Sequence, residues 1–337
     1  MTDALTMSTT MQALEVQALS RDFSGCHFVE MPVPRPGPGE VLIRIEAAGL
    51  GFPDLLMTRG EYQVKPPLPF VPGMEAAGTV VALGDGVTGL REGQRVLSGA
   101  KTGGLAGYGV FPASATMALP DALSFPEAAA LRAAYVTAWV ALVRRGQAQA
   151  GEWLLVHGAA GGVGLAAVDL ARHLGLCVIA VASNAEKRAT IARLYAPEQV
   201  IDPGEGIREQ VLEITGGQGV DLVYDPVGGD AFDQSVRCIA FNGRLLVIGF
   251  ASGRIPALGA NIALIKGFSM VGVRAGEYSR RFPDRGAEDS GTIVRLAAEG
   301  VIRPHVDRAL PLSRWREAFD AMASRAVVGR TVLLPHG

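Results

Sequence analysis

A glycine-rich segment in the middle of the chain has the residue types and spacing of a phosphate-binding loop. Residues 158–164 read Gly-Ala-Ala-Gly-Gly-Val-Gly, between an apolar run, Trp153–His157, and a helix-period segment that extends to about Leu174. Glycines let the backbone approach a pyrophosphate, and a helix N-terminus offers free N–H donors and the positive end of its dipole. Ala159 stands where the usual fingerprint has its first glycine. The pattern predicts a dinucleotide site, rather than a merely tight turn, at Ala160, Gly161, Gly162 and Val163.

The end of the next apolar run, Cys177–Ala182, indicates which nucleotide binds. An NAD site usually has an acidic residue here, about 20 residues after the loop, that holds the ribose 2′-OH. This chain has Ser183, which can hydrogen-bond a 2′-phosphate without charge repulsion, and Lys187, one of only four lysines, can pair with that phosphate. Glu186 counts against this interpretation, and Lys187 and Arg188 can also be explained as solvated charges on a helix. We expect NADPH rather than NADH as the cofactor.

The elements around the loop predict an α/β fold. Further strand candidates follow at Val200–Asp202, Asp221–Asp225 and Arg244–Phe250, with helical segments between them. Nearly continuous apolar strands that alternate with helices are typical of a parallel sheet covered on both faces. The first third instead has short alternating runs such as Val41–Ala47, separated by turns and a proline-rich connection, which favours a small antiparallel barrel or sandwich.

Composition sets the class of protein. At roughly 150 residues per domain, 337 residues predict about two domains. Hydrophobic residues make up 49% of the chain and charged residues 19%, which excludes disorder over most of it. A formal net charge of −2 gives no strong attraction to nucleic acid or to an anionic membrane, so neither is an expected partner.

Cysteine usage and the N-terminal residues indicate the compartment. Three distant cysteines form no disulfide framework, and no apolar run approaches the ~18 residues of a membrane span. Residues 1–10 are polar, lack a signal-peptide pattern and are expected to form a disordered extension. We therefore expect a cytoplasmic protein.

Several further motifs extend over nearly the whole chain from Met11. They are Pro36–Val41, Ala48–Asp54, Arg59–Tyr62, Pro72–Gly78, Thr137–Trp139, Val223–Gly229 and Gly249–Gly253. Together with residues 158–164 they resemble the medium-chain dehydrogenase/reductase superfamily, in particular its zinc-free branch, the NADPH:quinone oxidoreductases related to zeta-crystallin. The resemblance implies a Rossmann doubly wound parallel sheet over residues 132–273. It also implies a GroES-like β-barrel catalytic domain over residues 11–131 and 274–337, with the active site in the cleft between the domains.

The positions that hold zinc in related enzymes lack metal ligands here. Zinc-dependent relatives carry Cys where this chain has Gly51, His where it has Met74, and a second Cys near residues 132–135. Residues 94–115 also lack the cysteines of the structural zinc lobe. Because catalytic zinc needs about three N, S or O ligands, we expect no metal.

The resemblance implies hydride transfer from NADPH to a quinone. Two alternatives stay open: reduction of the C=C bond of enones or acrylate-like substrates, and an NADPH-binding protein with little catalysis. In either reduction, negative charge develops on a carbonyl oxygen, which a hydrogen-bond donor stabilises. Tyr62 matches a family tyrosine and is the first candidate donor, although it can also be an aromatic wall for the 66–72 loop. By the same resemblance, Thr137 lies near the nicotinamide and Tyr135 lines the substrate site.

Further cofactor contacts and the assembly follow from the same resemblance. Gly249, Phe250 and Ala251 face the nicotinamide, Val273 approaches its carboxamide, and Arg325 lies near the phosphates or is a surface charge. Related enzymes often have Asn at Gly51 and a tyrosine at Pro203, and these two departures bear on the identity of the substrate. The family usually pairs the last strand of each Rossmann sheet, here residues 267–273, so a homodimer is expected.

Overall fold

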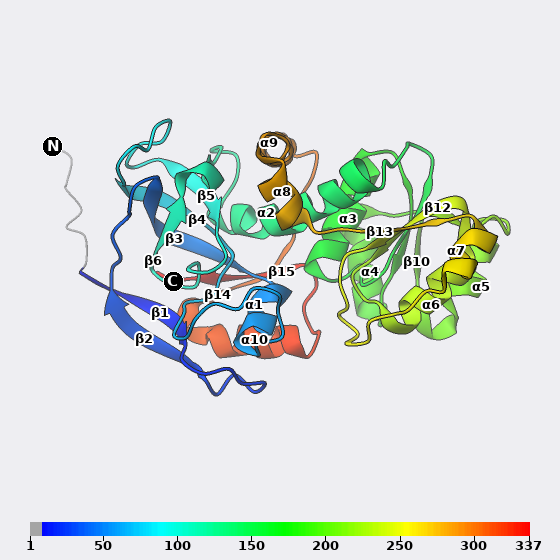
Figure 1. Ribbon diagram of the computed structural model, residues 1–337, viewed down its shortest axis with the longest axis horizontal. Coiled ribbons are helices and arrows are strands. Elements are labelled where there is room, and N and C mark those ends of the chain that lie inside the picture. Colours follow the sequence, from blue (N-terminus) through cyan, green and yellow to red (C-terminus); the bar gives the residue numbers. More distant parts are fainter. Residues whose placement is uncertain (1–8) are drawn as a thin grey trace. The chain divides into compact units, whose positions relative to one another are not determined.

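The computed structural model describes residues 9–337 and divides them between two units (Figure 1). One unit comprises the described residues up to Arg132 together with Pro304–Gly337, and the other comprises Ala133–Arg303. Residues 1–8 of the expected N-terminal extension lie outside the described residues. Thr10, which we placed in that extension, instead begins the first strand, because it pairs with Pro32 in an antiparallel hairpin.

A six-stranded parallel sheet forms the centre of the second unit. The spatial order is β10-β9-β8-β11-β12-β13, so the order reverses between β8 and β11. The strands are β8 (Trp153–Val156), β9 (Cys177–Val181), β10 (Gln199–Ile201), β11 (Val220–Asp225), β12 (Ile239–Val247) and β13 (Ser269–Gly272). This confirms the predicted α/β class with a doubly wound parallel sheet.

Helices connect and cover these strands. They are α3 (Gly162–His173), α4 (Ala185–Tyr195), α5 (Ile207–Ile214), α6 (Gly229–Cys238) and α7 (Ala260–Lys266). Helix α3 packs against β8 and β9 and contacts α4. Side chains of α5, α6 and α7 share an apolar cluster with the strands, including Val211, Phe232 and Ile262. Nearly every side chain of β11 is buried, as expected for a strand covered on both faces.

The first unit is a β structure, as predicted. Its sheet has the order β14-β15-β3-β4-β5-β7, with β6 also paired to β3, and β1 and β2 form a separate hairpin. The strands are β1 (Thr10–Val16), β2 (Cys26–Pro32), β3 (Glu40–Leu50), β4 (Glu75–Leu83), β5 (Arg95–Gly99), β6 (Tyr108–Pro112), β7 (Met117–Ala118), β14 (Val306–Pro311) and β15 (Arg330–Leu334). Helices α1 (Phe52–Thr58) and α10 (Trp315–Ala323) contribute to its apolar core through residues such as Leu55 and Phe319.

One segment lies in a different unit from the one we expected. Residues 274–303, which we assigned to the first domain, belong to the second unit and carry α8 (Ala275–Arg281) and α9 (Pro283–Ala298). The buried Asp289 of α9 accepts hydrogen bonds from Trp139 Nε1 at 3.0 Å and Arg144 Nη2 at 2.7 Å. These bonds attach α9 to the end of α2 (Phe125–Trp139) and to the π-helical segment Val140–Arg145 that continues it.

Short 3₁₀ turns at Ala113–Ala115, Pro203–Glu205 and Leu312–Arg314 complete the secondary structure described. Within residues 9–337, no helix combines the length and apolarity needed to cross a bilayer.

Candidate functional site

The predicted phosphate-binding loop lies between β8 and α3, in the expected context of a strand followed by a helix. Gly158 has φ +55°, and its carbonyl accepts the N–H of Gly161 at 2.8 Å, which closes the turn. A Cβ on Gly164 would lie 2.3 Å from the Gly158 carbonyl oxygen, so a side chain there is incompatible with this packing. The loop therefore needs glycine at Gly158 for its backbone angle and at Gly164 for close approach.

The four predicted loop residues surround the start of α3. Gly161 is the exposed N-cap of the helix, and Gly162 and Val163 in the first turn are half-buried. The first N–H groups of a helix have no intrahelical acceptor, so this turn presents donors and the positive dipole end. Ala160 is 6% exposed, which leaves its backbone rather than its side chain to meet a ligand. This arrangement suits a diphosphate.

The residues expected to select the nucleotide follow β9. Ser183 is exposed in the turn before α4, and the Asn184 side chain caps α4 by accepting the Lys187 N–H at 2.8 Å. The neighbouring Arg188 donates to Asp202 at 2.6 Å and to the Ala182 carbonyl at 3.1 Å. Arg188 is thus held by the protein itself, while the exposed Ser183 and the first turn of α4, which carries Lys187, lie next to each other after β9.

Asp225, at the end of β11, organises the loops of the same sheet edge. Its Oδ1 accepts the N–H groups of Val227 and Gly228, each at 2.8 Å, and its carbonyl accepts those of Ile248 and Gly249. We did not predict this role, although an acid before Pro-Val-Gly-Gly is a turn signal in the sequence.

The loop after β12 lies beside that turn. Ala251 donates its N–H to the Pro226 carbonyl at 3.0 Å, Phe250 is 40% exposed, and the buried Val273 donates to the Val247 carbonyl at 3.0 Å. The phosphate loop joins the same edge, because Ala159 donates to the Val181 carbonyl at 3.1 Å. The structure therefore gathers residues 160–163, 183, 249–251 and 273 at the carboxyl ends of the strands, where open parallel sheets bind ligands.

A buried histidine lies beneath the loops at this edge of the sheet. The Nε2 of His157 lies 2.6 Å from Ser235 Oγ, and both side chains are buried. Burial lowers the pKa of His157, while the nearby Asp225 charge opposes that shift. A neutral, hydrogen-bonded histidine fits packing beneath the loop, as we interpreted it, rather than acid–base chemistry.

Two candidate residues of α2 lie in the second unit. Tyr135 is 2% exposed, and its hydroxyl donates to the buried Asp169 at 2.7 Å. Burial raises the pKa of Tyr135 well above its usual value. Because the ring is enclosed and its proton is engaged, we no longer retain Tyr135 as a substrate-lining residue. Thr137 is half-buried, and its hydroxyl donates to the Ala133 carbonyl at 2.7 Å, so only its acceptor capacity faces outward.

The remaining candidates belong to the first unit. Tyr62 lies in the loop after α1, half-buried, with its ring packed against the apolar core of the unit. Arg325 is exposed, with φ +58°, in the turn after α10. The structure thus supports the aromatic-wall interpretation of Tyr62 without removing it as a donor, since its side chain is only partly buried.

A buried charged cluster lies beside Gly51 and Met74, the two positions that the resemblance matches to zinc ligands. Asp54 accepts the N–H groups of Gly51 and Gly73, each at 2.9 Å. Burial raises the pKa of Asp54 to about 6, while these two hydrogen bonds and Arg330 favour its ionised form. The Arg330 guanidinium pairs with Glu75, and both residues are buried.

These residues do not fit a catalytic metal. Gly51 offers no side-chain ligand and Met74 offers a weak one, and a guanidinium already compensates the Glu75 carboxylate. No group of three His, Cys, Asp or Glu side chains within residues 9–337 is arranged to hold a metal ion. We therefore derive no step through zinc.

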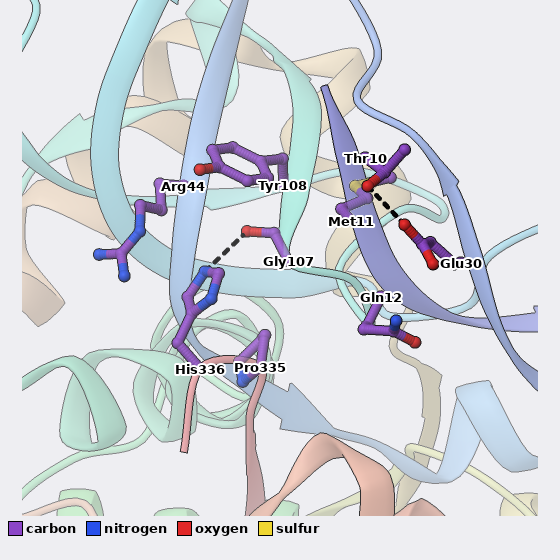
Figure 2. A pocket seen from close by; sticks show the side chains of 9 residues that line it. All are labelled: Thr10, Met11, Gln12, Glu30, Arg44, Gly107, Tyr108, Pro335 and His336. Carbon is purple, nitrogen blue, oxygen red and sulfur yellow. Dashed lines mark hydrogen bonds between the residues drawn. The ribbon is translucent and has the colours of Figure 1, made fainter. Parts of the chain in front are cut away.

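A separate pocket opens where the N-terminal strand approaches the C-terminal residues of the first unit (Figure 2). His336 Nε2 lies 3.2 Å from the Gly107 carbonyl, and its ring meets that of Tyr108 edge-on. Arg44 turns away from these groups in the figure and pairs with Glu46. The pocket contains none of the predicted site residues, and its charged groups do not converge, so we assign it no role in the chemistry.

Two family models match the chain. A model described as alcohol dehydrogenase GroES-like domain matches residues 37–121, and one described as zinc-binding dehydrogenase matches residues 162–288. A quinone oxidoreductase-like protein 2 homolog from Nematostella vectensis is 38% identical over 299 residues, which cover 88% of this chain and 82% of that protein. A quinone oxidoreductase from Pseudomonas aeruginosa is 35% identical over 307 residues, 89% of this chain and 92% of that protein.

Solved structures show the same fold. The structure of Escherichia coli quinone oxidoreductase complexed with NADPH matches with a TM-score of 0.85 at 30% identity, and the match covers 96% of this chain and 100% of that one.

Proposed function

Since the chain belongs to the quinone oxidoreductase-like family of medium-chain dehydrogenases/reductases, we propose that it reduces quinones by hydride transfer from NADPH without zinc. One observation carries the proposal: the phosphate loop, Ser183 and residues 249–251 share the carboxyl edge of one parallel sheet. The relative from Escherichia coli was solved with NADPH, which supports a nicotinamide nucleotide here.

The proposed preference for NADPH over NADH rests on the residues that follow β9. The 2′-phosphate adds negative charge, which an acidic residue at Ser183 would repel and which a cation attracts. Ser183 is exposed there, and Lys187 lies one turn away on α4. The neighbouring Arg188 pairs with Asp202. Ala160, Gly161, Gly162 and Val163 would hold the diphosphate, and Gly249, Phe250, Ala251 and Val273 would position the nicotinamide. Arg325 is retained as a further phosphate contact.

The bound cofactor would supply the hydride, and the protein would stabilise the charge that forms on the acceptor oxygen. Tyr62 is the proposed donor, because a phenol stays protonated at neutral pH and its side chain is only partly buried. Thr137 is the proposed second contact and would lie near the nicotinamide. Because its proton is donated to the Ala133 carbonyl, its oxygen can accept an N–H but does not stabilise the acceptor's negative charge.

We further propose a homodimer and a cytoplasmic location. Strand β13 is an edge of the six-stranded sheet, and an unpaired edge is a template for pairing with another chain. Large apolar side chains are exposed on and beside it: Met270 at 54%, Phe241 at 83%, Leu264 at 82% and Ile265 at 75%. Light scattering should give twice the 35.2 kDa chain mass. A monomer at micromolar concentration would contradict the dimer.

The test of function compares the initial rates of NADPH oxidation with 1,4-naphthoquinone and with a medium-chain enone. Faster turnover of the quinone is expected, with kcat reduced on the order of 10- to 100-fold in Tyr62→Phe because one donor to the oxyanion is lost. An unchanged kcat in that variant would leave Tyr62 as a packing residue. Preference for the enone would move the protein to the double-bond reductases. NADPH binding without turnover of either acceptor would favour a non-catalytic binding protein.

A further inference from the structure

The chain passes between the two units twice, after Arg132 and after Arg303. The first passage lies within α2, three residues before Tyr135. The second follows the 299–303 segment at the end of α9. Both passages are hydrogen-bonded, on the side of the second unit, to one side chain of α3, Asp169.

Asp169 is fully buried and receives two hydrogen bonds on one oxygen. Its Oδ2 accepts the Tyr135 hydroxyl at 2.7 Å and the Arg303 backbone N–H at 2.6 Å. These partners come from positions 34 and 134 residues away in the sequence. The one carboxylate therefore joins both chain passages.

Two more side chains hold the second passage. The buried Tyr195 of α4 donates its hydroxyl to the Arg303 carbonyl at 2.6 Å. Arg172 of α3 donates to the Val301 carbonyl at 3.0 Å and lies 3.6 Å from the second Asp169 oxygen. Main-chain groups at 301 and 303 are thus fixed by side chains of α3 and α4, without regular secondary structure of their own.

Helix α3 connects this network to the phosphate loop. Its N-cap is Gly161, and Asp169 lies eight residues, just over two turns, further along the same helix, roughly 12 Å at 1.5 Å per residue. Helix α3 has 12 residues with most of its side chains buried, which makes it the kind of rigid element through which coupling between its N-terminus and Asp169 can be carried.

We propose that Asp169 is a positioning residue that couples cofactor binding at the N-terminus of α3 to both passages between the units. The coupling rests on the proposed binding of NADPH. Its role is mechanical: Asp169 touches neither cofactor nor substrate, and it fixes residues 301–303 and the Tyr135 turn of α2 to the helix that carries the diphosphate.

The test is hydrogen–deuterium exchange followed by mass spectrometry on the full chain, with and without NADPH. Three peptide regions are compared: the phosphate loop at 156–166, the first passage at 130–138 and the second at 299–305. The variants are Asp169→Ala, the conservative Asp169→Asn, which keeps one acceptor oxygen, and Asp289→Ala. Asp289 is the matched control, because it is equally buried and its partners, Trp139 and Arg144, lie outside the three compared peptides. Tyr135→Phe removes a single bond and replaces Asp169→Ala if that variant does not fold.

Without NADPH, we expect exchange at 299–305 to be about tenfold faster in Asp169→Ala than in the wild type, since a buried hydrogen bond is lost. Asp169→Asn should fall between them, and Asp289→Ala should match the wild type at these amides. Equal exchange in the wild type and Asp169→Ala would overturn the anchoring role.

With NADPH, the loop and both passages of the wild type should become protected from hydrogen–deuterium exchange. In Asp169→Ala, only the loop should become protected. In parallel, Asp169→Ala should lower kcat for the quinone while the Kd for NADPH stays within about twofold. Protection of the loop without the passages in the wild type would overturn the coupling. If NADPH does not protect the loop of the wild type from exchange, the proposed cofactor is contradicted, and so is the coupling of that cofactor to the passages. The comparison of the variants without NADPH still tests whether Asp169 anchors residues 299–305.

Discussion

Arg188 and Asp202 form an ion pair, 2.6 Å from Nη1 to Oδ2, that joins the first turn of α4 to the residue after β10. Both side chains are about one-quarter exposed. The pair fixes Arg188 to the protein itself, and we propose the adjacent Lys187 as the cation that contacts the 2′-phosphate of NADPH.

We expect Lys187→Ala to raise the Kd for NADPH about tenfold, the loss of one charge-assisted contact, and to leave the Kd for NADH unchanged. Fluorescence titration of both nucleotides measures this. Arg188→Ala should weaken the binding of NADPH and NADH to a similar extent. The substitution removes the ion pair that joins α4 to Asp202, and we assign Arg188 no contact with the 2′-phosphate. Equal loss of the two nucleotides in Lys187→Ala would contradict the assignment.

A carboxylate at Ser183 should reverse the nucleotide preference. Ser183→Asp places a negative charge where the 2′-phosphate would bind and offers an acceptor to a ribose 2′-OH. NADPH affinity should fall by about 10- to 100-fold, while NADH affinity stays the same or rises. Ser313→Asp, at an exposed serine of the first unit, is the charge-matched control and should change neither titration. An unchanged NADPH affinity in Ser183→Asp would place the 2′-phosphate elsewhere.

The loop geometry makes a prediction about stability. Gly164→Ala forces a Cβ to within 2.3 Å of the Gly158 carbonyl oxygen, so backbone must shift, and we expect a loss of about 2–3 kcal/mol in the free energy of unfolding. Gly291→Ala is the matched control, because Gly291 lies inside α9 with no atom within 4 Å of an added Cβ. That variant should be stabilised by up to about 1 kcal/mol through helix propensity. Urea unfolding monitored by circular dichroism compares the two.

The parts of the site that depend on local pattern could be predicted from the sequence. The phosphate loop, the serine after β9 and the alternation of strands and helices each follow from residues within about one turn or one strand. Asp225 could have been included, because a strand that ends in Asp-Pro already signals a turn.

The errors arose where distant partners decide the outcome. Tyr135 occurs in a helix whose residues are apolar on every side, so periodicity could not show which face is enclosed, and its partner Asp169 lies on another helix. Residues 274–303 follow the last strand of the Rossmann sheet, yet Asp289 attaches them to Trp139, 150 residues away. Thr10 became a strand residue through its pairing with Pro32. None of these contacts has a local signature.

The buried Asp54 predicts how stability depends on pH. Its pKa rises from 3.8 to about 6 in the folded protein, chiefly because burial disfavours the carboxylate. The folded state therefore binds the proton more tightly than the unfolded state. The stability that Asp54 contributes is fully present below about pH 4 and is lost as the pH rises through about 6.

Asp54→Asn removes this titration. The neutral amide also loses one acceptor for the N–H groups of Gly51 and Gly73, so the variant carries a constant penalty at every pH. The free energy of unfolding of the variant minus that of the wild type should nevertheless rise by about 2–3 kcal/mol between pH 4 and pH 7. Urea unfolding at both pH values gives this difference, and Asp22→Asn, at an exposed carboxyl whose pKa is lowered by its hydrogen bonds to Ser24, should change in the opposite direction. A difference for Asp54→Asn that stays constant with pH would show that Asp54 is ionised throughout, held by Arg330 and the two backbone donors.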